Sequence, residues 1–205
     1  MYPPEPWHLR GQMYVSLFLV PHRLLPPLPA PLRAAARPVL VAGRAVVGTA
    51  WVHYEPGGTL DYRELLSSVL VVDRGRPRVS IIDIWVDSVA SRDGGRALWG
   101  IPKDLADLTV DPAGEHAVRV SASAARPIAG GAVRPRWTVP GRFPVAFSVV
   151  QALGEAVRRT PVRGRAGLRR ATAAWRADPA GPLGYLAGRK PFRTVAVTDF
   201  ALTFG

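Results

Sequence analysis

Lys103 is the first residue of this chain whose type and setting could support chemistry. Only two of the 27 basic residues are lysines, Lys103 and Lys190, and Lys103 directly follows the apolar run ALWGIP at 97–102. A lysine in an apolar setting loses its proton readily and becomes a nucleophilic amine, whereas an arginine keeps its charge. The pattern therefore indicates amine chemistry at Lys103. The alternative is a surface lysine that lays its stem over Trp99 and keeps its head in water.

Signatures of other chemistries are missing from the sequence. Zero cysteines exclude disulfides, thiolate metal ligands and a cysteine nucleophile. There is no G-x-S-x-G elbow, no phosphate-binding P-loop and no G-x-G-x-x-G after a strand. The histidines are isolated and lack H-E-x-x-H spacing; they are His8, His22, His53 and His116. We therefore expect neither a metal nor a cofactor.

Length and composition favour one globular domain that spans residues 1–205. At 48% hydrophobic residues the chain can bury a sizeable core. Its amino terminus lacks the charged start and apolar run of a signal peptide, and no stretch reaches about 18 uninterrupted apolar residues. We expect a soluble cytoplasmic protein without a membrane partner.

The formal net charge of +12 raises the question of a nucleic-acid partner, because phosphates attract clustered cations. The arginines are scattered along the sequence, apart from a denser stretch between 158 and 176. No zinc-finger spacing, aromatic RNA-binding motif or helix-turn-helix accompanies this stretch. We expect it to be a solvated face or linker, and we expect no nucleic acid. A basic scaffold that binds nucleic acid through this stretch is the alternative.

Apolar and β-branched runs predict a chain that is mostly strand. Residues 13–20 form a largely apolar run that Pro21 closes. Gly57-Gly58 and Asp93-Gly94-Gly95 are predicted to be turns. Further strands are predicted at 39–42, 45–54, 65–73, 79–87, 107–111, 116–124, 133–138 and 194–204.

Two segments carry a helical pattern. In residues 144–159 the apolar side chains recur at spacings of three and four, and the basic end complements the helix dipole. A weaker helical segment runs over residues 165–176. Several short strands with one or two helices predict an α+β chain, mostly antiparallel β, built as a barrel or sandwich.

Three segments resemble acetoacetate decarboxylase and its relatives, in the same order and at similar spacing. They are WHLR at 7–10, YRE at 62–64 and GRALWGIPK at 95–103. Motifs cover roughly residues 5–110 and, more diffusely, the closing strand at 195–204. The resemblance implies a β-cone or barrel-like double sheet with flanking helices, assembled into homo-oligomers.

The resemblance also implies roles for five residues. Lys103 matches the Schiff-base lysine and Glu64 the active-site acid, so both are expected to be catalytic. Arg10, Tyr62 and Trp99 are expected to bind the substrate, with Arg10 holding its carboxylate. A neutral Lys103 amine would add to the ketone carbon of a keto acid and form a protonated imine. That cation would accept the electron pair released as carbon dioxide leaves.

This chemistry requires the pKa of Lys103 to fall from about 10.4 toward roughly 7 to 8 near neutral pH. We expect burial against Trp99, Ile101 and Trp85 to contribute, together with the positive charge of Arg10.

Two positions depart from the family pattern. Where well-known members carry a second lysine after the Schiff-base lysine, this chain has Asp104. A carboxylate in the pocket would raise the pKa of the amine, but neighbouring side chains on a strand point to opposite faces. Thr49 stands near the position of another family glutamate, for which Asp61 or Glu55 could compensate.

The sequence therefore predicts a Schiff-base lyase that decarboxylates acetoacetate or a related β-keto acid. Aldolase or dehydratase chemistry through the same imine is open, because it also needs an amine and a carboxylate clamp. A pocket that binds a small acidic ligand without turnover is the third alternative.

Overall fold

The computed structural model describes residues 1–114 and 117–205 of the chain. His116 and the start of the strand predicted at 116–124 lie outside the described residues. The strands are β1 (Trp7–Pro21), β2 (Ala36–Pro38), β3 (Leu40–Val41), β4 (Arg44–Tyr54), β5 (Tyr62–Asp73), β6 (Arg76–Val86), β7 (Lys103–Leu105), β8 (Asp107–Pro112), β9 (Val118–Ser123), β10 (Pro127–Leu153), β11 (Ala156–Ala177) and β12 (Arg193–Phe204). The helices are η1 (His22–Leu24), α1 (Ala30–Ala35), α2 (Val89–Trp99) and η2 (Gly184–Leu186).

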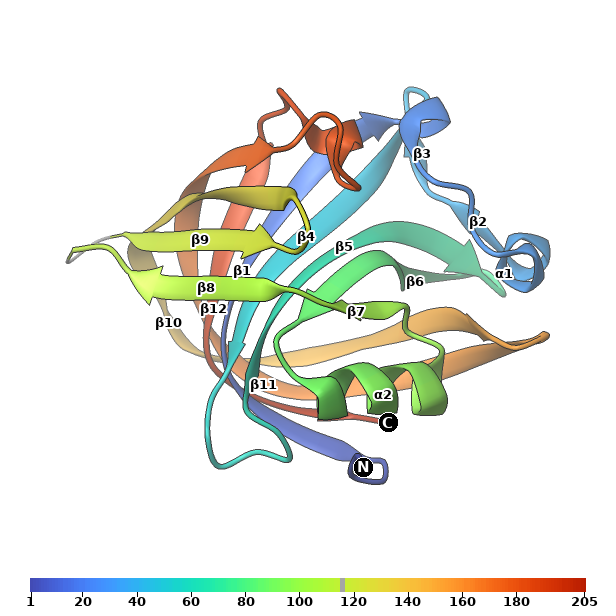
Figure 1. Cartoon of the computed structure of the whole chain (residues 1–205), viewed down its shortest axis with the longest axis horizontal. Coiled ribbons are helices and arrows are strands. Elements are labelled where there is room, and N and C mark those ends of the chain that lie inside the picture. Colours follow the sequence, from blue (N-terminus) through green and yellow to red (C-terminus); the bar gives the residue numbers. More distant parts are fainter. Residues whose placement is uncertain (115–116) are drawn as a thin grey trace.

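The strands form one sheet with the order β7-β6-β5-β4-β1-β12-β11-β10-β9-β8. Neighbours are antiparallel except where β6 meets β7 and β10, with which it is parallel. Because β6 also pairs with β10, the strands between them in this order close into a ring-like cone. Figure 1 shows the long β10 and β11 bending around the molecule and passing behind α2. The expected mostly antiparallel cone with flanking helices is confirmed.

The helices expected at 144–159 and 165–176 are wrong, because both segments belong to the β10–β11 hairpin. The strands pair from Leu153↔Ala156 at the turn to Ala129↔Ala177 at the far end. Gly154 has a φ of 59° and allows the tight connection between them. Val145 and Val149, which are four apart, also share one face of a strand, whereas Ala152, three residues after Val149, packs against a different cluster.

The turn expected at Asp93-Gly94-Gly95 is also wrong, since these residues lie inside α2. Ser88 caps this helix with its hydroxyl, which accepts a hydrogen bond from the Ser91 amide. Gly100 ends it in the left-handed conformation, with a φ of 66°. The turn expected at Gly57-Gly58 is confirmed.

The described residues form three apolar clusters, and the central strands separate the two largest of them. The lysine-side core contains Tyr54, Tyr62, Trp99, Ile101 and Phe200. The opposite core contains Trp51, Leu65, Trp85, Leu183 and Tyr185. Because side chains alternate along a strand, β4 sends Tyr54 to the first core and Trp51 to the second. Within the described residues, no helix is long and apolar enough to cross a membrane.

Candidate active site

Lys103 is the first residue of β7 and lies beside Ile84 of β6 in the parallel register. On the other side of β6, Glu64 of β5 pairs with Val86. The lysine and the glutamate thus approach each other across β6 on the lysine-side face. Only 4% of Lys103 and 2% of Glu64 is exposed, so the pair is screened from water.

The Lys103 ammonium donates three hydrogen bonds. Its Nζ lies 2.8 Å from Glu64 Oε2, 2.9 Å from Ser91 Oγ and 3.2 Å from the Tyr62 hydroxyl. An ammonium group has three protons, so these contacts satisfy all of them. Tyr54 donates to the other carboxylate oxygen of Glu64 at 3.1 Å. The geometry describes a buried amine and carboxylate held by hydroxyl groups.

Burial and charge act in opposite directions on the pKa of Lys103. Burial alone lowers it, but the Glu64 carboxylate and Tyr62 outweigh burial and hold the pKa above its ordinary value. The expected fall of the pKa toward neutrality is therefore not found in this arrangement. Without a bound substrate, the lysine is an ammonium paired with a carboxylate.

The two tyrosines stay protonated across the physiological pH range. Burial, helped by the charge of Glu64, raises the pKa of Tyr62 to about 12. Burial also raises the pKa of Tyr54 well above its ordinary value. The rings stack with centroids 4.4 Å apart, and the Lys103 Nζ lies 4.9 Å from the Tyr62 centroid. Both hydroxyls can therefore donate to an oxygen near the amine.

Helix α2 supplies the roof of the site through residues four apart. Ser91, Gly95 and Trp99 share one helix face. A Cβ on Gly95 would lie 2.8 Å from Lys103 Cδ, so the missing side chain makes room for the lysine stem. Trp99 closes the apolar end, where its ring meets Trp7 edge-on at 4.7 Å. Its indole nitrogen donates to Glu5 at 2.9 Å.

Arg96 fixes the backbone that carries the lysine. Its Nε donates to the Lys103 carbonyl at 2.6 Å, and its Nη2 pairs with Asp104. The Asp104 side chain is 66% exposed while Lys103 is buried. Asp104 therefore points away from the Lys103 amine and pairs with Arg96. This matches the alternative in which neighbouring strand residues face opposite sides.

Of the expected substrate-binding residues, the structure brings Tyr62 and Trp99 to the lysine-side core but does not bring Arg10. Arg10 is exposed on β1, while its neighbour Leu9 packs in that core. The Arg10 guanidinium lies over Gly57 in the β4–β5 connection. Among the described residues it forms no hydrogen bond or ion pair with Lys103 or Glu64.

The structure also places Trp85, Thr49, Asp61 and Glu55 away from the amine. Trp85 packs in the opposite core and does not wall the amine. Thr49 is buried on the same face as Trp51, where its hydroxyl donates to the Ser16 carbonyl. Neither Asp61, which is exposed, nor Glu55, which accepts from Gln12 at 3.2 Å, replaces a second acid beside Lys103.

Tyr54 and Ser91 are site residues that the sequence reasoning missed. Tyr54 lies directly opposite Tyr62 in the β4–β5 register. Ser91 was hidden because the glycines after it were read as a turn and not as a helix interior. No cluster of three or more His, Asp or Glu side chains that could hold a metal ion occurs in the part of the chain that the structure describes.

The fold and site together define an antiparallel β-cone protein with a buried lysine paired to a buried carboxylate. The family model for acetoacetate decarboxylase (ADC) matches residues 4–161. The chain belongs to the acetoacetate decarboxylase family. No match was found among curated proteins.

Solved structures share this fold at low sequence identity. Acetoacetate decarboxylase from Legionella pneumophila is 17% identical with a TM-score of 0.71, over 98% of this chain and 86% of that one. The enduracididine biosynthesis enzyme MppR complexed with pyruvate is 20% identical with a TM-score of 0.67, over 100% and 90%. An acetoacetate decarboxylase-like enzyme from Sphingomonas wittichii is 14% identical with a TM-score of 0.66, over 99% and 92%.

Proposed function

We propose that this chain is a Schiff-base lyase that decarboxylates acetoacetate or a related small β-keto acid through an imine at Lys103. The observation that carries the proposal is the buried Lys103–Glu64 pair, with Nζ and Oε2 2.8 Å apart. A buried charge pair is weak evidence for a stabilising role, because desolvation cancels much of its attraction. Its position under α2 in a decarboxylase-family fold supports a chemical role.

The pair suggests how the amine becomes neutral. When a substrate carbonyl enters, transfer of one proton from Lys103 to Glu64 would leave a neutral amine and a neutral acid. The amine adds to the carbonyl carbon, and the acid protonates the resulting oxygen to give a carbinolamine hydroxyl. Glu64 then passes one proton from the added nitrogen to this hydroxyl, which leaves as water and gives the protonated imine. The hydroxyls of Tyr62 and Ser91 stay within hydrogen-bonding distance of the amine, and they can donate to the substrate oxygen.

The imine then carries the positive charge that decarboxylation needs. As carbon dioxide leaves, the electron pair of the broken carbon–carbon bond moves toward the iminium nitrogen and gives an enamine. Protonation of the enamine carbon and hydrolysis release the ketone and restore Lys103. No guanidinium contacts the amine in the described site, so the hydroxyls of Tyr54, Tyr62 and Ser91 are the groups that would meet the substrate carboxylate.

Aldolase or dehydratase chemistry on a keto acid is the second candidate. A solved relative, MppR, is described in complex with the condensation product of pyruvate and imidazole 4-carboxaldehyde, at 18% identity. The same enamine can attack an aldehyde in place of a proton. Both reactions pass through Lys103, so product analysis has to separate them.

The decisive test is intact-protein mass spectrometry after incubation with acetoacetate or pyruvate and borohydride. We expect a stable adduct that maps to Lys103 and disappears in Lys103→Ala. The matched control is Lys190→Ala, because Lys190 is the chain's second lysine and is exposed. Absence of an adduct with a panel of keto acids from neutral to alkaline pH would leave a binding pocket without imine chemistry.

A further inference from the structure

The outer face of β9, β10 and β11 carries cations that lie far apart in the sequence. Arg119 on β9 pairs with Ala132 on β10, and Arg134 on β10 pairs with Thr172 on β11. Val133, between the two β10 residues, is 1% exposed and belongs to the opposite core. Because side chains alternate along a strand, Arg119 and Arg134 point away from that core into solvent.

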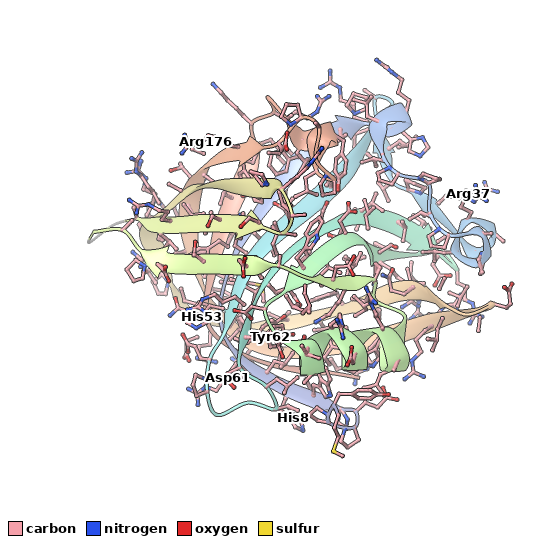
Figure 2. The ribbon with its side chains drawn as sticks, viewed as in Figure 1. His8, Arg37, His53, Asp61, Tyr62 and Arg176 are labelled. Atoms are coloured by element: carbon pink, nitrogen blue, oxygen red, sulfur yellow. The ribbon has the colours of Figure 1, made fainter. Side chains whose placement is uncertain are left out.

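Three grooves along β9, β10 and β11 share arginines. The grooves are numbered here from β9 toward β12. Arg134 lines the first and second grooves, and Arg136 lines the second and third. Arg119 and Arg176 complete the cations of the first groove, and Arg169 completes those of the second. The shared residues make the grooves one continuous basic track. It occupies the side of the molecule where Figure 2 labels Arg176.

The third groove has a volume of about 730 Å³ and adds cations from the segment before β12. Arg170 comes from β11, Arg189 and Lys190 come from this segment, and Arg193 is the first residue of β12. No aspartate or glutamate lines any of the three grooves among the residues that the structure describes. The track therefore attracts anions, and it repels a second copy of the same face.

Two exposed aromatic side chains lie in the third groove. Trp137 is 59% exposed and Phe192 is 57% exposed, although large apolar surface is costly in water. The Arg170 guanidinium lies 5.4 Å from the centroid of the Trp137 ring. An exposed aromatic ring beside arginines can stack on a planar base while the cations contact phosphates.

We propose that this track binds single-stranded nucleic acid. Arg170 and Arg176 lie on the same face of β11, and the strand extends for roughly 20 Å between them, which is too long for one nucleotide and sufficient for several. Paired bases are stacked inside a duplex, so Trp137 and Phe192 favour an unpaired strand. Their exposure gives no advantage to a phosphate polymer that lacks bases.

The structure changes the interpretation of the arginine-rich stretch. Arg158 pairs with Glu5 and Arg159 pairs with Asp73, so the first arginines of the stretch are occupied elsewhere. Arg169, Arg170 and Arg176 join cations from β9, β10 and the segment before β12 only after folding. The density of arginines along the sequence therefore did not predict the track.

The test measures the anisotropy of a labelled oligodeoxythymidine of about fifteen nucleotides, at about 50 mM and about 200 mM salt. We expect binding that weakens with salt, and each of Arg134→Gln and Arg170→Gln should reduce the log–log salt slope by about 0.7. The matched control is Arg37→Gln, an exposed arginine on β2 that Figure 2 shows on the other side of the molecule. It should leave affinity and slope close to those of the unmodified chain.

Trp137→Ala tests the stacking platform. It should weaken binding by about fivefold or more without changing the salt slope. Melting temperatures equal to that of the unmodified chain show that the variants fold. Four results would overturn the proposal: no binding at the lower salt, equal affinity for a duplex, equal affinity for a free mononucleotide, or an equal loss in Arg37→Gln.

Discussion

At the residue scale, Lys103 is held between two opposing influences. Its burial favours the neutral amine, and Glu64 at 2.8 Å favours the ammonium. Burial is the largest single influence, but the charges and hydrogen bonds of Glu64 and Tyr62 together outweigh it, so the pKa of Lys103 lies above its ordinary value. A chain with this arrangement stores its nucleophile as a protonated ion pair. In the mechanism proposed above, the amine becomes available when this proton moves to the carboxylate.

Glu64→Gln separates the two influences. The glutamine keeps a similar shape but removes the negative charge, so burial should bring the pKa of Lys103 below its value in the unmodified chain. We expect borohydride trapping to reach half its maximum at a lower pH in the variant, by one pH unit or more, on the order of the pair's interaction. Trapping is measured against pH with a fixed keto acid.

The control for this variant is Glu55→Gln, since Glu55 contacts Gln12 and not Lys103. Its trapping profile should follow that of the unmodified chain. A Glu64→Gln profile that is unchanged, or displaced to higher pH, would show that Glu64 does not set the protonation of the lysine.

Sequence reasoning reached part of this residue constellation. Lys103 and Glu64 were found through the YRE and GRALWGIPK segments, and they do meet in the structure. Tyr54 was missed because its partner lies across a hairpin. Arg10 was placed in the pocket by resemblance, although β1 turns it to the exposed face. A short motif identifies a residue, but the face of the strand decides what that residue contacts.

At the scale of elements, α2 determines how much space the lysine has. Gly94 and Gly95 lie in the helix interior, where glycine costs about 1 kcal/mol relative to alanine. Both occur where the helix packs closely: a Cβ on Gly94 would meet the Trp7 ring at 2.5 Å, and one on Gly95 would meet Lys103. The glycines were read as a turn because the sequence shows their flexibility but not the neighbours that require them.

Gly95→Ala tests this packing. The added methyl group would lie 2.8 Å from Lys103 Cδ and 2.9 Å from Cε, so the lysine stem has to move. We expect trapping at Lys103 to slow by about tenfold or more, on the order of one lost hydrogen bond to a charged group. The rate of adduct formation is measured by mass spectrometry over time.

The melting temperature of Gly95→Ala provides the control for this experiment. Alanine favours a helix more than glycine does, and this gain offsets the cost of moving the lysine stem. We therefore expect Gly95→Ala to melt as high as the unmodified chain while it traps the keto acid more slowly. Gly75→Ala is unsuitable because Gly75 has a φ of 72°. Ser88→Ala is more informative: it removes the cap of α2 without touching Lys103, and it should reduce stability more than trapping. Unchanged trapping in Gly95→Ala would show that Gly95 is not needed to leave room for the lysine stem.

The wrong helices in β10 and β11 have a related cause. In residues 144–159, Val145 and Val149 recur four apart, which suits a helix face. They also lie on one face of a strand, because four is a multiple of two. The turn at Gly154, with Leu153 paired to Ala156, decides between these structures, and it depends on contacts with β12 and β6 that the local sequence does not contain.

At the scale of the whole molecule, the ring is closed by few backbone contacts. The seam between β6 and β10 has one register pair, Val79↔Val149. Side chains reinforce it: Ser80 donates to Gln151 Oε1 at 2.9 Å, and Gln151 Nε2 donates to the Ile81 carbonyl at 3.0 Å. Closure of the cone therefore depends on buried polar contacts, which composition and periodicity do not predict.

Asp73 contributes buried ion pairs to the closure of the cone. Its side chain is fully buried at the end of β5, with Arg159 of β11 and Arg78 of β6 each 2.8 Å away. The hydrogen bond from Arg159 and the charge of both arginines hold the pKa of Asp73 below its ordinary value. A lowered carboxyl pKa stabilises the folded state above the unfolded pKa of about 3.9, and this contribution is lost as the pH falls through the folded value.

Asp73→Asn should therefore destabilise the fold at neutral pH and matter less in acid. Removing one partner of a buried pair leaves two arginines uncompensated, and we expect a loss of about 3 kcal/mol in the free energy of unfolding at pH 7. The loss is measured by urea denaturation, and the difference from the unmodified chain should narrow below about pH 4. Asp199→Asn is the control, because Asp199 is 73% exposed in its pair with Arg142 and such pairs contribute under about 1 kcal/mol. Equal losses in the two variants, or a difference independent of pH, would show that the Asp73 cluster does not hold the cone closed.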